Sequence, residues 1–174
     1  AKEGLGDRAE SLTRDAVAIA TSARDATNPE ALVLGSVAPL EDCYSPGLAP
    51  DADTCRREHA QLIDQLVDAG VDMLATGSFA EACALRDAGV TTPVLLLAGA
   101  LPAAMGSVLA RGLIPTVYDL DGARAVSQAA SSISSIFVKV DCGLGRVGVA
   151  LDQAGALLDD IADLPNVQVQ GLYT

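Results

Sequence analysis

The sequence has few aromatic and few basic residues. Its 174 residues include no tryptophan, two phenylalanines and three tyrosines, although half of the residues are apolar. A core must therefore be built from alanine, valine, leucine and isoleucine, which suits helices packed on a parallel sheet that is covered on both faces. The 23 acidic residues outnumber the 11 basic ones, giving a net charge of −12. This charge argues against nucleic acid and anionic membrane surfaces as partners.

Signals for membrane insertion, export and metal binding are also scarce. No apolar run approaches the roughly 20 residues of a membrane span, and Ala1–Gly4 do not resemble a signal peptide, so we expect a cytoplasmic protein. The chain has four cysteines and a single histidine, with no Cys-x-x-Cys pair. A zinc site would need Cys43, Cys55 and His59 to converge, at a spacing that matches no standard site. We therefore expect free thiols and no metal.

Strand and helix patterns alternate along the chain. Helices are predicted over 7–26, 54–69, 79–88, 102–110, 121–130 and 151–164, and strands over 31–35, 71–75, 93–99, 115–119, 136–141 and 167–173. The later strands begin every 21 or 22 residues, which is typical of minimal β-α units with right-handed crossovers. The predicted fold class is α/β, with about six parallel β-α units in a single domain over residues 1–174.

The number of units is too small for a complete barrel. An eight-unit TIM barrel usually takes about 250 residues, so we expect an incomplete or reclosed barrel derived from TIM-barrel fragments. A smaller closure, an open sheet or pairing between two chains would each deal with the strand edges. Because exposed edges favour pairing with another chain, we expect self-association through them.

The segment Lys139–Val149 carries the strongest functional signal. An apolar run leads into Lys139, Asp141 and Arg146, separated by glycines, and α/β proteins place functional groups where strands end. Lys139 and Asp141, two residues apart on a strand, project to the same face. Three interpretations stay open: a charged cluster that ties down the loop, an anion or cofactor site, and a G-x-G-x-x-G nucleotide loop over 143–148.

Residues from about 76 to 174 resemble the N-terminal barrel of alanine racemase, a pyridoxal-phosphate enzyme. The segments that carry the resemblance are Phe79–Ala82, Leu85–Gly89, Pro93–Leu97, Pro115–Val117, Lys139–Val149 and Gly171–Thr174. The resemblance implies that Arg146 hydrogen-bonds the phenolic oxygen of the cofactor. It implies that Lys139 is the structural lysine, carbamylated in some members, that fixes this arginine. The Schiff-base lysine would lie on the family's first strand, and the histidine that stacks on the cofactor would follow Thr174.

Residues 1 to about 75 are similar instead to the homocysteine S-methyltransferase family, a zinc-dependent (β/α)8 barrel. The segments concerned are Gly4–Glu10, Val33–Leu40, Arg57–Ala60 and Ala69–Leu74. That family's zinc-binding cysteines have no counterpart here, and Ala75-Thr76-Gly77 replaces its usual Glu-Thr pair. The chain is therefore interpreted as a chimera of two barrel fragments joined near residues 74–78.

The predicted function follows from this interpretation. We expect a chimeric barrel fragment without catalytic activity, acting as a folding or assembly unit. One alternative is a pyridoxal-phosphate-dependent racemase with residual isomerase activity, and another is a module that binds small anions at the strand ends. Lys139 and Arg146 are the predicted cofactor-binding residues, and no residue is predicted to be catalytic. The only lysines are Lys2 and Lys139.

Overall fold

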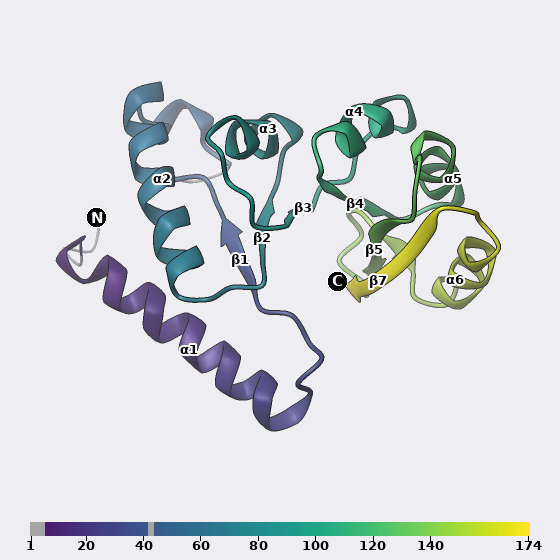
Figure 1. The fold of residues 1–174 in the computed structure, drawn as a ribbon, viewed down its shortest axis with the longest axis horizontal. Coiled ribbons are helices and arrows are strands. Elements are labelled where there is room, and N and C mark those ends of the chain that lie inside the picture. Colours follow the sequence, from purple (N-terminus) through teal and green to yellow (C-terminus); the bar gives the residue numbers. More distant parts are fainter. Residues whose placement is uncertain (1–5, 42–43) are drawn as a thin grey trace. The chain divides into compact units, whose positions relative to one another are not determined.

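The computed structural model describes residues 6–41 and 44–174 (Figure 1). Its residues form two compact units, Ala1–Ala75 and Thr76–Thr174, each with its own packing. The division falls where the sequence suggested a junction between two families. The organisation of residues 1–174 as one domain stays a prediction. Among the described residues, no helix has the length and apolar character needed to cross a bilayer.

The first unit is built from two long helices and two short strands. Its elements are the 3₁₀ turn η1 (Gly6–Arg8), α1 (Ala9–Thr27), β1 (Leu34–Val37), η2 (Pro46–Leu48), α2 (Ala52–Asp68) and β2 (Met73–Thr76). Helix α2 packs against both α1 and β1 (Figure 1). Gly35 on β1 leaves room for the side chains of Leu66 and Leu74, which are buried in this small core.

Helix α2 begins earlier than predicted. The sequence predicted a helix over 54–69, but the helix begins at Ala52, and the side chain of Asp51 accepts hydrogen bonds from the backbone N–H groups of Asp53 and Thr54, each at 3.0 Å. A carboxylate that satisfies two free N–H groups at a helix N-terminus is a strong start signal. These hydrogen bonds lower the pKa of Asp51, the one from Thr54 most strongly.

The second unit alternates helices and strands, as the α/β prediction requires. Its elements are α3 (Phe79–Asp87), β3 (Val94–Leu96), η3 (Pro102–Ala104), α4 (Met105–Ala110), β4 (Ile114–Val117), α5 (Leu120–Ala129), β5 (Ser134–Asp141), β6 (Val149–Ala150), α6 (Ala154–Ala162) and β7 (Val167–Tyr173). Strand β3 pairs with β4, β4 with β5, and β5 with both β6 and β7, always in parallel. The predicted α/β fold with parallel strands is confirmed, although β6 was not predicted.

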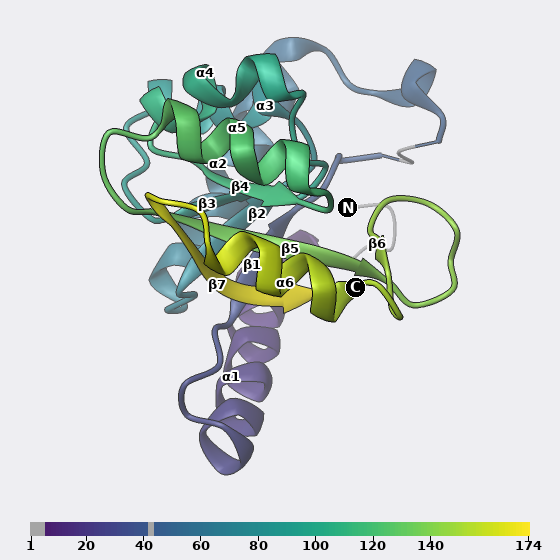
Figure 2. The same ribbon diagram turned by 90° about the vertical axis from the view of Figure 1, so that its right-hand side faces the viewer.

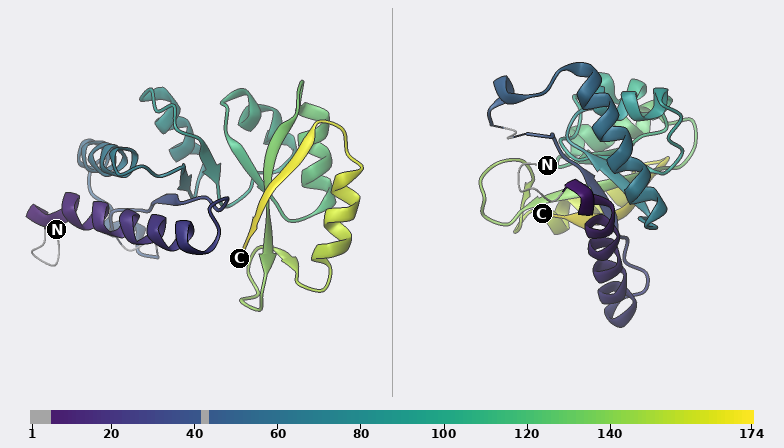
Figure 3. Two further views of the ribbon diagram at one scale, coloured as in Figure 1. Left: turned by 60° about the horizontal axis from the view of Figure 1, so that its bottom comes forward. Right: turned by 90° about the vertical axis from the view of Figure 1, so that its left-hand side faces the viewer.

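Helices α5 and α6 cover one face of these strands. The core between them includes Val126 on α5, Ile161 on α6, and Ile136 and Val138 on β5, all at most 1% exposed. Figures 2 and 3 show β5 and β7 side by side with α6 beside them. The burial of alternate β5 residues on this side leaves Lys139 on the opposite face.

Arg86 joins the turns at the amino ends of β3 and β4 without help from a carboxylate. Its guanidinium donates hydrogen bonds to the carbonyls of Val90 and Thr92, both at 2.8 Å, and to those of Arg111 and Gly112 at 3.2 and 2.9 Å. Partial burial lowers the pKa of Arg86, but an arginine stays charged in this range. Because binding sites of barrels lie at the opposite, carboxyl ends of the strands, we assign Arg86 a role in stability.

Candidate functional site

A pocket of about 470 Å³ opens at the carboxyl ends of the strands of the second unit. Its lining consists of Gly77, Leu97, Ala98, Lys139, Arg146, Val147, Tyr173 and Thr174. Figure 2 shows the loop between β5 and β6 next to the carboxyl end of β7. Lys139 and Arg146 also line a neighbouring pocket of about 220 Å³, together with Asp141 and Cys142. The structure therefore brings together the two residues predicted to bind a cofactor.

Lys139 lies over an aromatic ring rather than beside a carboxylate. It is the register partner of Tyr173 on the neighbouring strand, and its Nζ lies 4.7 Å from the centre of the Tyr173 ring. This is a cation–π contact, in which the negative face of the ring stabilises the ammonium. Lys139 is the only lysine among the described residues, since Lys2 lies outside them.

Asp141 organises the loop that follows β5. Its carboxylate accepts hydrogen bonds from the backbone N–H groups of Gly143, Gly145 and Arg146, at 2.9 to 3.1 Å. The first two of these bonds contribute most to lowering the pKa of Asp141. The expectation that the charged residues tie down the loop is correct for Asp141. It acts through backbone N–H groups and not through an ion pair with Lys139 or Arg146.

The nucleotide-loop interpretation of Gly143, Gly145 and Gly148 is wrong. A dinucleotide loop leads directly into a helix whose N-terminus faces the phosphates, whereas this loop leads into strand β6. The structure also gives another reason for Gly148. A Cβ at this position would lie 2.5 Å from the backbone nitrogen of Asp141, and its φ is +143°. Gly148 therefore allows close backbone approach at the base of the loop.

Arg146 is held by its backbone while its side chain remains available. Its N–H is bonded to Asp141, and its guanidinium is exposed to solvent at the wall of both pockets. Within residues 6–41 and 44–174, no ion pair joins Lys139 or Arg146 to a carboxylate. Two cations without carboxylate partners in one pocket favour an anionic ligand.

Of the three residues that a zinc site would have needed, only Cys55 and His59 lie among the described residues. His59 Nε2 lies 3.1 Å from the carbonyl oxygen of Ala38, and the Cys55 thiol lies 3.5 Å from that of Pro50. Cys43 lies outside the described residues. In the described part of the chain, no group of three or more potential metal-binding side chains comes together.

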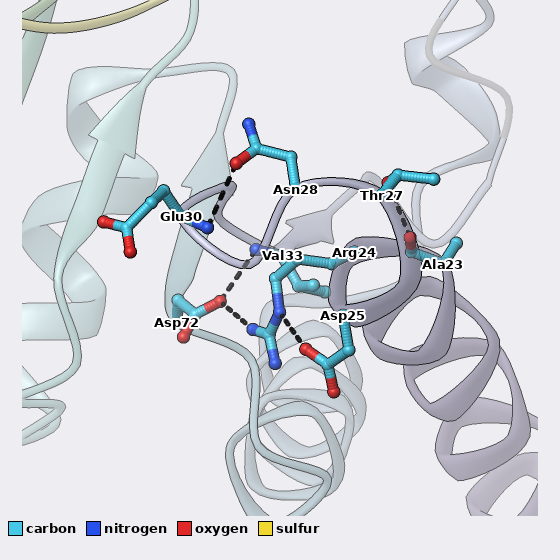
Figure 4. Close-up of polar contacts among 8 residues, drawn as sticks. All are labelled: Ala23, Arg24, Asp25, Thr27, Asn28, Glu30, Val33 and Asp72. Atoms are coloured by element: carbon cyan, nitrogen blue, oxygen red, sulfur yellow. Dashed lines mark hydrogen bonds and ion pairs between the residues drawn. The ribbon is translucent and has the colours of Figure 1, made fainter.

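Charged side chains of the first unit form ion pairs with one another, unlike Lys139 and Arg146 in the second unit. Asp72 Oδ2 accepts hydrogen bonds from the backbone N–H of Val33 at 2.8 Å and from the Arg24 guanidinium at 3.0 Å (Figure 4). Arg24 also bonds Asp25 at 2.9 Å, and this bond is the largest cause of its raised pKa. The cluster links the end of α1 to the start of β1, with each charge matched by a partner.

The comparisons with known proteins place this pocket in a family. The family model described as the alanine racemase N-terminal domain matches residues 52–174, which include every residue of both pockets. The chain belongs to this family. The prediction made from the Lys139–Val149 and Gly171–Thr174 segments is confirmed at the level of the family.

Individual relatives support the same assignment. The alanine racemase of Syntrophobacter fumaroxidans is 31% identical over 155 residues, covering 87% of this chain and 38% of the relative. That of Desulfovibrio desulfuricans is 35% identical over 116 residues, covering 65% and 31%. The structure of alanine racemase from Clostridium difficile in complex with cycloserine aligns with a TM-score of 0.68 at 21% identity, covering 95% of this chain and 40% of that one. The chain thus spans about two fifths of the length of these proteins.

The chimera interpretation needs correction. The family match begins at residue 52, within the segment assigned to a methyltransferase. The alignment with the Syntrophobacter protein covers too much of the chain to fit within residues 76–174. The comparisons therefore extend the racemase family across the boundary near residue 75 and show no methyltransferase segment.

Tyr173 is the residue of the pocket that sequence reasoning left without a role. It stood within the Gly171–Thr174 motif, but the residues that define its function are distant in sequence. Its hydroxyl donates a hydrogen bond to the Leu97 carbonyl at 2.8 Å and lies 2.9 Å from the Thr116 hydroxyl. Only strand pairing could reveal these contacts.

Proposed function

We propose that this chain forms the part of an alanine racemase-type site that holds the anionic groups of pyridoxal phosphate. The observation that supports the proposal is the pairing of Lys139 and Arg146 in a pocket of about 470 Å³ that is lined by no acidic side chain. The residues fit such a cofactor because phenolate and phosphate oxygens both require cationic donors. When bound, the cofactor would supply an electron sink next to an amino acid's α-carbon.

Each pocket residue has a distinct part in this proposal. The planar guanidinium of Arg146 donates paired hydrogen bonds to an oxyanion, while the Lys139 ammonium adds a second positive charge. Leu97, Ala98 and Val147 provide apolar walls beside these charges, which can contact the apolar part of a ligand.

Binding and turnover are separate claims. The ammonium of Lys139 is engaged with the Tyr173 ring, whereas a Schiff base forms from a free amine. We therefore expect the 174-residue chain to bind pyridoxal phosphate reversibly and not to racemise alanine. A coupled assay with D-amino-acid oxidase checks this expectation, and D-alanine formation above the rate without protein would contradict it.

Calorimetric titration tests the binding claim with three ligands. Pyridoxal phosphate should bind more tightly than inorganic phosphate, and pyridoxal without its phosphate should bind most weakly. Absence of pyridoxal phosphate binding would contradict the proposal. Borohydride reduction followed by mass spectrometry should give no adduct at Lys139 if binding is non-covalent.

A second candidate function is the binding of small anions in general. It is favoured by the same two cations, because a positive pocket on a chain of net charge −12 attracts any small anion. Equal affinities for inorganic phosphate and pyridoxal phosphate would support this candidate over the first.

A further inference from the structure

We infer that Tyr173 is a positioning residue that fixes the Lys139 ammonium at the pocket wall beside Arg146. The contact itself is a property of the strands, and its consequence for ligand binding rests on the function proposed above. Three features of the second unit support the inference: the register of two strands, the tether of the tyrosine hydroxyl, and the charge that the ring leaves in the pocket.

A register shift between β5 and β7 brings Tyr173 next to Lys139. Ile136 pairs with Val169, but the next residue, Phe137, pairs with Gly171, so Gln170 is an extra residue on β7. Without this β-bulge the first register would continue and place Leu172, not Tyr173, opposite Lys139. Bulges commonly re-aim side chains next to functional sites.

Gly171 makes the new register possible. A Cβ at this position would lie 2.7 Å from Cε1 of the Phe137 ring, closer than real side chains approach. The absence of a side chain lets Phe137 cover the bulge while it remains only 6% exposed. The glycine and the bulge therefore act together to present Tyr173 on the face that carries Lys139.

Hydrogen bonds of the Tyr173 hydroxyl add to the strand pairing that places the ring. The hydroxyl donates its single proton to the Leu97 carbonyl, so the hydrogen bond with Thr116 must be donated by the threonine hydroxyl. Thr116 is 1% exposed on β4, which makes this an anchor within the core. Burial raises the pKa of Tyr173, and its hydroxyl therefore remains a donor at neutral pH.

An aromatic partner differs from a carboxylate in its effect on the pocket. A carboxylate beside Lys139 would neutralise one of the two cations, whereas the ring attracts the ammonium through its quadrupole and carries no charge. Both positive charges therefore remain available to an anion. Holding Lys139 in place also removes rotamer freedom that binding would otherwise have to restrict.

Two variants separate the ring from the hydroxyl. Tyr173→Leu removes the ring, and Tyr173→Phe keeps it while removing the tether. The matched control is Tyr118→Leu, which removes a tyrosine of the same unit that lines neither pocket with Lys139. The native chain and all three variants would be labelled with [¹³C]lysine, and a Lys139→Arg variant would assign the two lysine signals.

The first measurement is the ring-current shift of the Lys139 ε-methylene signals. We expect an upfield shift in the native chain that persists in Tyr173→Phe and Tyr118→Leu and disappears in Tyr173→Leu. The second is phosphate affinity by calorimetry, which should fall about tenfold in Tyr173→Leu, change less than threefold in Tyr173→Phe, and stay unchanged in Tyr118→Leu.

The two measurements distinguish failure of this inference from failure of the proposed function. A native chain without the ring-current shift overturns the inference, as does an unchanged phosphate affinity in a folded Tyr173→Leu variant. If the native chain binds neither phosphate nor pyridoxal phosphate, the proposed function fails. The ring-current measurement still decides where Lys139 lies. If Tyr173→Leu does not fold, loss of the shift in Tyr173→Phe overturns the claim that the ring is sufficient.

Discussion

The two charged clusters of this molecule differ in how their charges are matched. Around Asp72 in the first unit, the carboxylate accepts hydrogen bonds from a guanidinium and from a backbone N–H, so opposite charges meet. Around Lys139 in the second unit, two cations share a pocket, and the Asp141 carboxylate that lines the neighbouring pocket accepts hydrogen bonds from three backbone N–H groups. Matched charges stabilise a fold, whereas unmatched charges of one sign are available to a ligand.

This difference separates two uses of similar residues. The Asp72 cluster lies where α1 leads into β1, before the strand begins. The Lys139 cluster lies where β5 and β7 end, and parallel α/β proteins place their binding sites at the carboxyl ends of strands. The comparison predicts that changes in the first cluster lower stability and leave binding unchanged, whereas changes in the second cluster weaken binding.

The largest expected effect comes from Gly171→Ala, which perturbs the pairing of β5 and β7 that places Tyr173 beside Lys139. The added Cβ would meet the Phe137 ring at 2.7 Å, and overpacking of this kind costs about 1–3 kcal/mol. Urea denaturation should show this loss of unfolding free energy, together with weaker binding of pyridoxal phosphate. The matched control is Gly155→Ala on α6, where nothing lies within 4 Å. Equal stabilities of the two variants would show that the bulge tolerates a side chain.

Asp72→Ala tests the first cluster. It removes the acceptor for both Arg24 and Val33, so the melting temperature should fall by several degrees. Affinity for pyridoxal phosphate should not change, because Asp72 lines neither pocket. As a control, Asp53→Ala removes only an exposed ion pair with Arg56 and should hardly affect melting. If Asp72→Ala lowered the affinity and left the melting temperature unchanged, the first cluster would serve binding and not stability, which would contradict the comparison.

The smallest expected effect is that the stability of the loop after β5 depends on pH through Asp141. Because hydrogen bonds from Gly143 and Gly145 lower the pKa of Asp141 in the folded chain, its contribution to stability is complete above the ordinary value of 3.8. This contribution is lost as the pH falls through the lowered pKa. Amide exchange at Gly143 and Gly145 should therefore become faster, relative to its intrinsic rate, only at acidic pH. In Asp141→Asn this acidic transition should be missing, and its persistence would mean that another group controls the loop.

Local sequence patterns predicted most of the secondary structure. Strand β7 has the predicted limits of 167–173, and α3 differs from its prediction by one residue. These elements have a clear apolar pattern and strong boundary signals, such as the Ser78 capping box before α3. Strand β6 was missed because two residues carry no periodic pattern, and their pairing with Val140 and Asp141 depends on the loop between them.

The site was only partly predictable, for a physical reason. Lys139 and Arg146 could be identified because they lie close together in a glycine-rich motif. The role of Tyr173 depends on a single extra residue, Gln170, which changes the side chain presented to Lys139. A one-residue shift in register exchanges the two faces of a strand, and no local pattern in Val167–Tyr173 marks it. The assignment of residues 1 to about 75 to a methyltransferase was wrong, because the racemase family match already begins at residue 52.

The most direct test of the account is the affinity of Arg146→Gln for pyridoxal phosphate, measured by calorimetry beside Arg124→Gln. Both variants lose one positive charge from the second unit, but Arg124 lies on α5 near Asp121 and lines neither pocket. The account predicts that Arg146→Gln weakens binding at least about tenfold, equivalent to about 1.4 kcal/mol, with no change in melting temperature, and that Arg124→Gln binds like the native chain. Equal affinities of the two variants would contradict it.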